Sequence, residues 1–492
     1  MKILLVNPRI RPRHPPSDFP IGLGIIASIM LREGHEVRVY DDNALRPDPE
    51  AFRRDLAGMP EPDVVGIGGL ITTYTHLKKM VPALKERFPR AVFICGGGVT
   101  IEPEVIFENL PVDFCVHGEG EHTFRELCAA LEVGRGNDLA GVQGISLRDV
   151  RSGRIITTAP RPIERDLDRF PFPAYDLFPS ELYFSNNRGQ IKFWKKGATV
   201  QRCAPLVWSR GCPNECTFCW RMMGRTVRFR SMDNLMREIA FLRSQYGVDS
   251  YFFYDECINA SRSKAMEFAR RLLDAGYAAP WYSHARTDRF DDELASWFSR
   301  SGCIGLNFGI ESGSEKMLKL MRKRADPERA AQAVAVAMRA GIAPQCTFII
   351  GTPGETRATV RESVQWIRRT RVKHFSFFYF TPYPGCEEYE RPQTQERIRR
   401  RYDSRNAYFS ILGDAYNLVV NLTNVSDARL IRWREWAYRA ARERPRERWI
   451  RRLLEIASLV KKAAALLVQP ARWRTVIANR LRRSGWYEFR SP

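Results

Sequence analysis

The stretch Ser209-Arg210-Gly211-Cys212-Pro213-Asn214-Glu215-Cys216-Thr217-Phe218-Cys219-Trp220 places three cysteines at C-x3-C-x2-C spacing, directly after the apolar run Leu206-Val207-Trp208. Three thiolates on one short loop indicate a metal site. A structural zinc ion usually takes four ligands arranged as two separated pairs, and the chain has no second C-x2-C pair. A cubane iron–sulfur cluster has four irons, so three thiolates leave one iron open to a small ligand. The spacing therefore favours an iron–sulfur cluster over zinc.

Composition bounds the class of protein. The chain has 492 residues, 44% of them hydrophobic, which suggests two to four domains at about 100–200 residues per domain. The net charge of +22 brings an anionic partner or surface into consideration, whether nucleic acid, membrane or an acidic substrate, and charge alone does not choose among them. The apolar run at Ile3–Val6 is too short for a signal peptide, and no stretch of 18 apolar residues follows. We expect a cytoplasmic protein whose eleven cysteines are thiols or ligands.

The N-terminal part alternates short apolar runs with segments long enough for one helix each. Such a series predicts a doubly wound parallel sheet, whose ligands bind beyond the carboxyl ends of the strands. Glycines fall at those ends, where backbone can approach a flat or bulky ligand closely. No G-x-G-x-x-G motif opens the first unit, so a dinucleotide site is not supported. The expected strands are Ile3–Val6, Val37–Tyr40, Val64–Ile67, Val92–Cys95 and Phe114–Val116.

A second series of the same kind starts at Leu206, with helical patterns such as Met232–Tyr246 and Pro327–Ala340 between its apolar runs. Polar residues and glycines again follow the runs, where the functional groups of parallel sheets gather. Cys257, Cys303 and Cys346 stand beside strand patterns and are interpreted as small core residues. The expected strands are Leu206–Trp208, Tyr251–Tyr254, Trp281–His284, Ile304–Phe308, Thr347–Ile350 and Phe375–Phe380.

The cysteine loop resembles the cluster-binding signature of the radical SAM superfamily. The resemblance implies a 4Fe-4S cluster on Cys212, Cys216 and Cys219, with S-adenosylmethionine (SAM) chelating the open iron. It also implies that the second series forms a partial (β/α)6 barrel of the TIM type. Residues in the loop and at successive strand ends resemble the family's SAM contacts: Phe218, Asp255, Glu256, Arg286, Glu311 and Gly351.

Three N-terminal segments resemble the cobalamin-binding domain found before the cluster domain in a radical SAM subfamily. They are Phe19–Gly24, Cys95–Gly98 and His117–Glu121. The D-x-H-x-x-G motif that supplies a histidine to cobalt in many cobalamin proteins is missing, which implies a lower cobalt face without a protein imidazole. The cobalamin contacts implied are Gly22, Gly68, Thr72, Gly96, Gly97, Gly98, Gly118, Glu119 and Gly120.

These readings divide the chain into four parts. Residues 1–135 are expected to be the cobalamin-binding, Rossmann-like domain, and residues 201–390 the radical SAM core. Residues 136–200 contain the proline-rich segments 159–163 and 170–174 and are interpreted as an extended linker. Residues 391–492 are expected to form a basic, helical region. Its tryptophan-bearing helices suit either a membrane interface or packing on the barrel.

The resemblance implies that an electron entering the cluster cleaves SAM to methionine and a 5′-deoxyadenosyl radical, which removes a hydrogen from the substrate. Methylcobalamin would then methylate an unactivated carbon, and a second SAM would restore the methyl group. A cobalamin-dependent cyclase or rearrangement enzyme fits the same motifs. An RNA methylthiotransferase and a zinc-dependent nucleic-acid-binding protein fit them less well.

The expected partners are a small-molecule or lipid-like substrate and an electron donor such as flavodoxin or ferredoxin. Nucleic acid is not expected. The basic, tryptophan-bearing tail is compatible with peripheral association with the inner face of the membrane, but packing on the barrel is the interpretation that we favour.

Overall fold

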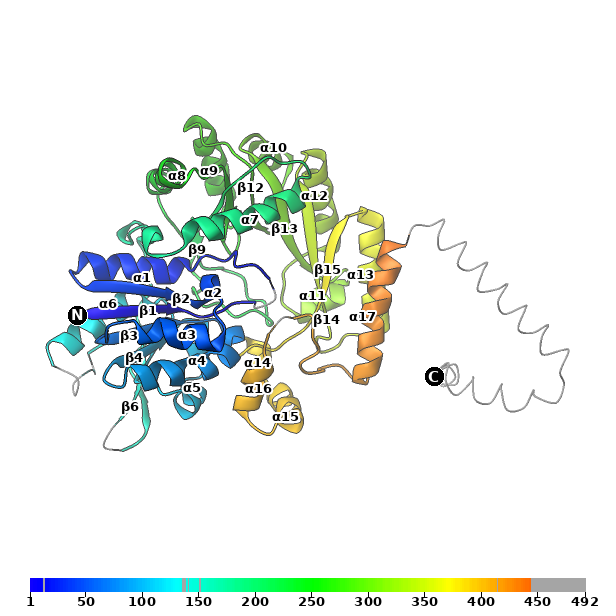
Figure 1. The fold of residues 1–492 in the computed structure, drawn as a ribbon. Helices are drawn as coiled ribbons and strands as arrows, with labels where there is room; N and C mark the ends of the chain where they lie inside the picture. The colour runs from blue at the N-terminus through cyan, green and yellow to red at the C-terminus, as the bar shows by residue number, and fades with distance from the viewer. Residues whose placement is uncertain (12–13, 135–138, 140, 150–151, 414, 444–492) are drawn as a thin grey trace, which may run out of the picture. The chain divides into compact units, whose positions relative to one another are not determined.

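The computed structural model describes residues 1–11, 14–134, 139, 141–149, 152–413 and 415–443. They contain two large sheets, one following the other along the chain (Figure 1). The second is all parallel, and the first is parallel except for an antiparallel hairpin at one edge. The elements below belong to the unit Met1–Arg434, except that the last helix, α17 (Asp427–Arg442), continues beyond it. The predicted α/β class is confirmed.

The first sheet contains all five strands that the N-terminal apolar runs predict. They pair in parallel in the order β2-β1-β3-β4-β5. Their bounds are β1 (Lys2–Asn7), β2 (Glu36–Asp41), β3 (Val64–Gly68), β4 (Val92–Gly96) and β5 (Phe114–Val116).

Helices cover both faces of this sheet, as a doubly wound fold requires. Leu4 and Val6 of β1 belong to one core, and Ile3 and Leu5 belong to the other. The first core includes α3 (Pro49–Ala57), α4 (Tyr74–Arg87) and α5 (Pro103–Asn109), and the second includes α1 (Ile21–Arg32) and α6 (Gly120–Glu132). The short α2 (Asp42–Leu45) follows β2.

The interpretation of residues 136–200 as an extended linker is wrong in two places. First, β6 (Ile145–Arg148) and β7 (Ile155–Thr157) form an antiparallel hairpin that extends the first sheet beyond β5. Second, Ser180–Trp194 forms helix α7, which buries Tyr183, Phe184, Ile191 and Trp194. Those positions recur at helical spacing. The two proline-rich segments do remain outside helices and strands, and a short 3-10 turn, Leu167–Arg169, lies between them.

The second sheet is the predicted partial barrel. Its six strands are all parallel, in the order β15-β14-β13-β12-β11-β8, and both edges are open. The strands are β8 (Cys203–Leu206), β11 (Ser250–Phe253), β12 (Trp281–Ala285), β13 (Cys303–Glu311), β14 (Ala343–Ile350) and β15 (His374–Tyr379). The helices are α8 (Met232–Tyr246), α9 (Arg262–Asp274), α10 (Asp292–Arg300), α11 (Glu315–Leu320), α12 (Pro327–Arg339) and α13 (Arg357–Thr370).

The first barrel strand lies earlier in the chain than predicted. β8 ends at Leu206, where the predicted strand begins, and it contains Pro205. Proline is tolerated there because β8 is an edge strand, so the missing N–H does not interrupt a ladder. Trp208 is nevertheless fully buried and stacks on Phe268 of α9, with ring centroids 4.9 Å apart.

Helix α7 closes one side of this sheet. The Trp194 ring lies 6.0 Å from the Tyr282 ring, between centroids, and it also covers Gly305 of β13. A Cβ at Gly305 would lie 2.3 Å from an atom of the Trp194 ring. Glycine at 305 therefore allows α7 to approach the barrel strands closely.

The chain returns to the first sheet after the barrel. The segment contains α14 (Glu387–Glu390), α15 (Pro392–Arg401) and α16 (Arg405–Ile411), and residues from it complete the first of the two N-terminal cores. Phe409 packs edge-on against Tyr74 of α4, and the Tyr74 hydroxyl donates to Asn406 Oδ1 at 2.8 Å. Within the described residues, no helix is long and apolar enough to cross a membrane. The tail helices expected between residues 449 and 481 lie outside the described residues.

We predict that Gly305→Ala lowers the free energy of unfolding by about 1–3 kcal/mol, because the added methyl group overlaps Trp194. The matched control is Gly189→Ala in α7 itself, where a Cβ would meet no atom within 4 Å. This control should be neutral or stabilising by up to about 1 kcal/mol, since alanine favours helix. Urea denaturation followed by circular dichroism measures both changes. Equal stability of Gly305→Ala and the parent chain would contradict the packing described.

Candidate active site

The cysteine loop is held at its base by a two-stranded antiparallel ribbon, β9 (Ser209–Arg210) with β10 (Arg228–Phe229). Gly211 follows β9 with φ +95°, and a Cβ there would lie 2.3 Å from the Thr226 carbonyl oxygen. Only glycine fits this turn. The Cys212 N–H then donates to the Gly224 carbonyl at 3.2 Å, which closes the loop.

The three thiols that the sequence predicts as ligands share this loop. Cys216 is buried, Cys212 is partly exposed and Cys219 is exposed. Burial raises the pKa of the Cys216 thiol, and the nearby cations Lys323 and Arg286 oppose that shift. The cations therefore favour the thiolate, which is the form that binds metal.

The donor set suits a cluster better than a single ion. Within the described residues, no three His, Cys, Asp or Glu side chains are grouped to hold one ion. Thiolates that each bind a different iron of a cluster do not need to converge on one point. The three cysteines therefore fit a 4Fe-4S cluster with one open iron.

Asp255 and Glu256, which follow β11, occupy different environments. Asp255 is fully buried and accepts hydrogen bonds from the backbone N–H groups of Trp208 and Ser209, at 3.3 and 2.5 Å. Burial raises its pKa to about 6. Its oxygens therefore hold the strand that leads into the cysteine loop, and they do not face open space. Glu256 is exposed and hydrogen-bonds the backbone of Gly211, so it is the carboxylate of this pair that is available to a ligand.

Glu311, Arg286 and Phe218 lie around one residue that the sequence does not single out, Lys323. The Lys323 ammonium donates to Glu311 Oε1 at 2.8 Å and lies 5.9 Å from the centre of the Phe218 ring. The Arg286 guanidinium donates to the Lys323 carbonyl at 3.2 Å. The structure thus brings together three of the predicted SAM contacts, which come from the cysteine loop and from the ends of β12 and β13.

Glu311 has a backbone conformation that is rare outside glycine, with φ +62°. It lies at a bulge in the pairing of β13 with β14. Such strain persists only where surrounding contacts enforce it, and it is common at ligand sites. The buried ion pair with Lys323 is one such contact.

Gly351 ends β14 with φ +100°, and its N–H donates to Glu355 Oε2 at 3.4 Å. Glu355 is buried and also accepts from the Thr359 hydroxyl at 2.6 Å. Burial raises the pKa of Glu355 to about 7. This carboxyl supports the turn on which the predicted SAM contact lies.

A cavity opens at the carboxyl ends of the first sheet. Its volume is about 1070 Å³, which includes space open to solvent. Apolar residues of β1, α1 and α6 are among those that line it. Eight of the nine predicted cobalamin contacts line it: Gly22, Gly68, Gly96, Gly97, Gly98, Gly118, Glu119 and Gly120. A Cβ at Gly22 or Gly118 would meet no protein atom within 4 Å, so these positions border open space. A glycine-rimmed, apolar cavity of this kind fits a large, flat cofactor such as cobalamin.

Two predicted cobalamin contacts are placed differently from the rest. Thr72 is exposed on the 3-10 turn η1 (Ile71–Thr73) and is absent from the lining. Glu119 does border the cavity, but its carboxylate forms an ion pair with Arg228 of β10. The sequence alone does not reveal this pairing, because the two residues are far apart along the chain.

The cysteine loop and the cavity share a wall. Met222 and Met223 of the loop line the cavity together with the glycines of the first sheet. Trp220 lies against Gly98, where a Cβ would approach its ring to 2.8 Å. The cluster loop therefore lies next to the cavity, with aromatic and thioether side chains between them.

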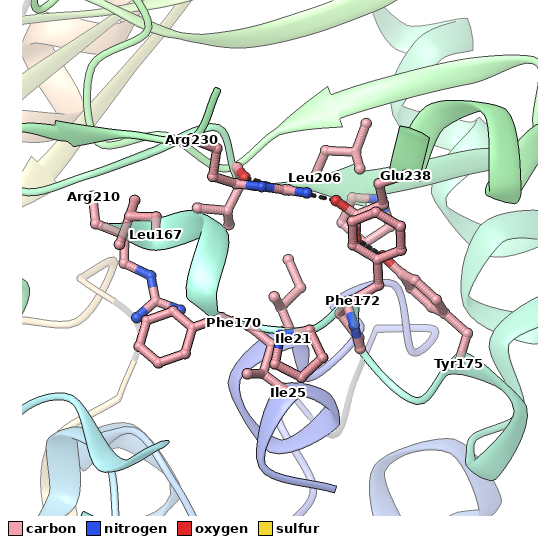
Figure 2. A pocket seen from close by; sticks show the side chains of 14 residues that line it. Ile21, Ile25, Leu167, Phe170, Phe172, Tyr175, Leu206, Arg210, Arg230 and Glu238 are labelled. Atoms are coloured by element: carbon pink, nitrogen blue, oxygen red, sulfur yellow. Dashed lines mark hydrogen bonds and ion pairs between the residues drawn. The ribbon is translucent and has the colours of Figure 1, made fainter. Parts of the chain in front are cut away.

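A second, smaller cavity lies between α1 and the barrel, with an empty volume of about 410 Å³ (Figure 2). Figure 2 shows the Arg230 guanidinium pointing at Glu238, with Tyr175 on the other side of that carboxylate. The Tyr175 hydroxyl donates to Glu238 at 2.8 Å. Because these charges satisfy one another, the cavity is interpreted as part of the packing between the two sheets.

Comparisons with known proteins agree with this geometry. The model of the Radical SAM superfamily matches residues 206–367, and that of the B12 binding domain matches residues 18–128. An uncharacterized methyltransferase of Pyrococcus horikoshii is 31% identical over 402 residues, which cover 79% of this chain and 83% of the relative. Cytidylyl-2-hydroxyethylphosphonate methyltransferase of Streptomyces wedmorensis is 29% identical over 442 residues, 78% of this chain and 80% of the relative.

Among solved structures, a similar one is that of the radical S-adenosylmethionine methyltransferase TsrM from Kitasatospora setae, with cobalamin and a 4Fe-4S cluster bound. It aligns with a TM-score of 0.64 at 20% identity and covers 81% of this chain and 75% of that chain. At this identity the likeness shows that the two chains share a fold.

We predict that the buried Glu355 makes the chain less stable as pH rises. Its pKa is raised in the folded state, so the folded chain binds the proton more tightly than the unfolded chain between about pH 4.5 and 7. The stability contributed by the protonated form is lost over that range. The free energy of unfolding of Glu355→Gln should therefore rise by up to about 3 kcal/mol relative to that of the parent chain between pH 4.5 and 8.

Urea denaturation at each pH measures this difference in the free energy of unfolding. Exposed Glu86 of α4 provides the control, as Glu86→Gln. A pH-independent difference between Glu355→Gln and the parent would contradict the prediction.

Proposed function

Because the chain belongs to the radical SAM superfamily and carries a B12-binding domain, we propose that it methylates an unactivated carbon of a small-molecule or lipid-like substrate. The family uses a 4Fe-4S cluster and SAM, and the B12-binding domain adds cobalamin. When bound, the cluster supplies the electron that cleaves SAM, and cobalamin supplies the methyl group. Family membership displaces the zinc-dependent nucleic-acid-binding alternative.

The observation that carries the proposal is the shared wall between the cysteine loop and the glycine-rimmed cavity. Transfer of a methyl group to a substrate radical requires both reactive centres within reach of one carbon atom. Two cofactor sites far apart in space would not bring both reactive centres within reach of one carbon atom. Methyltransferase relatives that align over more than three quarters of this chain support the same conclusion.

The residues of this chain have distinct parts in the reaction. Cys212, Cys216 and Cys219 hold the cluster. Exposed Glu256 accepts hydrogen bonds from the SAM ammonium, and Glu311, fixed by Lys323, accepts from the ribose hydroxyls.

The loop between the two sites keeps water away from the radical. Trp220, Met222 and Met223 are partly buried and separate the cysteines from the cavity. SAM cleavage needs an electron from outside the chain, and we infer a flavodoxin or ferredoxin as electron donor.

The cofactor assignment predicts two separable losses of metal. After anaerobic purification with hydroxocobalamin and reconstituted iron and sulfide, the parent chain should contain about four irons and one cobalt. Replacing Cys212, Cys216 and Cys219 by alanine should remove iron and leave cobalt. Gly68→Leu should instead remove cobalt and leave iron, because the leucine side chain would enter the cavity without striking the backbone. Elemental analysis measures the iron and cobalt content of each variant. Tightly bound zinc in place of both would refute the assignment.

The reaction type predicts the fate of SAM. A methyltransferase consumes two SAM molecules for each product, one yielding 5′-deoxyadenosine and the other S-adenosylhomocysteine. A cyclase or rearrangement enzyme yields the first product without the second. We therefore expect equal amounts of both when the reduced holoenzyme is incubated with substrate-containing small-molecule extract, measured by mass spectrometry. 5′-Deoxyadenosine alone would favour the cyclase alternative.

A further inference from the structure

Two arginines face each other at the base of the cysteine loop. Arg210 on β9 and Arg228 on β10 are directly opposite in the antiparallel ribbon. Their side chains are only 10% and 3% exposed. Like charges directly opposite on a ribbon repel each other, and burial removes the water that would screen them. The ribbon therefore needs anionic partners in order to form.

The first domain supplies those partners from a single turn. Glu119 binds Arg228 with both carboxylate oxygens, at 2.7 and 2.8 Å, and lies 3.5 Å from Arg210. Glu121 accepts from Arg210 at 2.7 Å. The two glutamates are 8% and 6% exposed, so two positive and two negative side chains neutralise one another inside the protein. We call Glu119, Glu121, Arg210 and Arg228 the charge quartet.

The quartet is connected to both cofactor sites. On one side, Glu119 and Glu121 lie between β5 and the body of α6, on the rim of the glycine-lined cavity. On the other side, Arg228 also donates to the Met223 carbonyl at 2.9 Å, inside the cysteine loop. Arg210 rests on the Phe170 ring, 5.0 Å from its centre, an arrangement that Figure 2 shows. A shift of either glutamate must therefore move the base of the loop, because a buried arginine cannot remain unpaired.

We propose that the charge quartet is a positioning device that couples occupation of the cobalamin cavity to the order of the cluster loop. A cofactor seated against Gly118 and Gly120 restricts the turn that carries the two glutamates. The glutamates in turn fix Arg210 and Arg228, and with them the ends of the loop that holds the cluster. Such coupling is reciprocal, so each cofactor strengthens the binding of the other.

The test is the rate at which cluster iron is lost to an iron(II) chelator such as ferrozine, without turnover. The full-length, cluster-loaded enzyme is compared with and without bound hydroxocobalamin under anaerobic conditions. In the parent chain, hydroxocobalamin should slow iron loss at least about fivefold, the lower end of typical coupling. In Glu119→Gln/Glu121→Gln, hydroxocobalamin should still bind but should no longer slow the loss. The matched control is Glu126→Gln, a partly exposed glutamate of α6 that pairs with Arg161 outside the quartet.

Each alternative result overturns the proposal. Equal slowing in the double variant would show that the coupling does not pass through the quartet, and no slowing in the parent chain would show that there is no coupling. Loss of hydroxocobalamin binding in the variant would make the glutamates cofactor contacts instead. If the double variant does not fold, Glu121→Gln, which leaves the Glu119–Arg228 pair intact, allows the same comparison. Cobalt content of the parent chain is measured separately, so failure of the proposed cofactor set is distinguishable from failure of the coupling.

Discussion

The ion pairs between the Glu119-Gly120-Glu121 turn and the β9–β10 ribbon are the constraint on which the arrangement of the two sites depends. Burying four charges is costly, and each is tolerated only because the others are present. One glutamate–arginine pair could form in several relative positions of the two sheets. Two pairs, one of them bidentate, allow far fewer, because planar guanidinium and carboxylate groups must align. The position of the cluster loop against the glycine rim follows from that alignment.

The two candidate cofactor sites consist of different types of residue, in keeping with their expected ligands. The rim of the first sheet is rich in glycine, so a large ligand can lie against backbone. The site around Cys216 is crowded with charge, and the Glu311–Lys323 pair is enforced by a strained backbone. A cleaved sulfonium and a reduced cluster need such fixed charges, whereas a bulky cofactor mainly needs space. The contrast explains why glycine turns dominate one site and paired ions dominate the other.

Sequence patterns reveal most of the fold because the predicted strands of both sheets pair in parallel and are buried. Their strands are continuous apolar runs, and glycines mark where they end. The C-x3-C-x2-C loop is likewise visible because its ligands are neighbours along the chain. Lys323 could not be found in this way, since nothing in the sequence around it distinguishes this buried lysine from exposed ones. The pairing of Glu119 with Arg228 is hidden for the same reason: a glycine-rich turn beside a cavity looks like a cofactor contact until its distant partner is known. Helix α7 was obscured by Gly189 and by polar residues between its buried aromatic side chains.

The return of the chain to the first sheet after the barrel has a consequence for the order of events during synthesis. The core beneath α4 includes Tyr408, Phe409 and Leu422, which leave the ribosome long after β1 to β5. Contacts over such sequence separations form late. The N-terminal domain therefore emerges first but completes its core only when the barrel has already been made. Tyr74 of α4, whose ring packs on Phe409, therefore lacks this partner while the barrel is being synthesised.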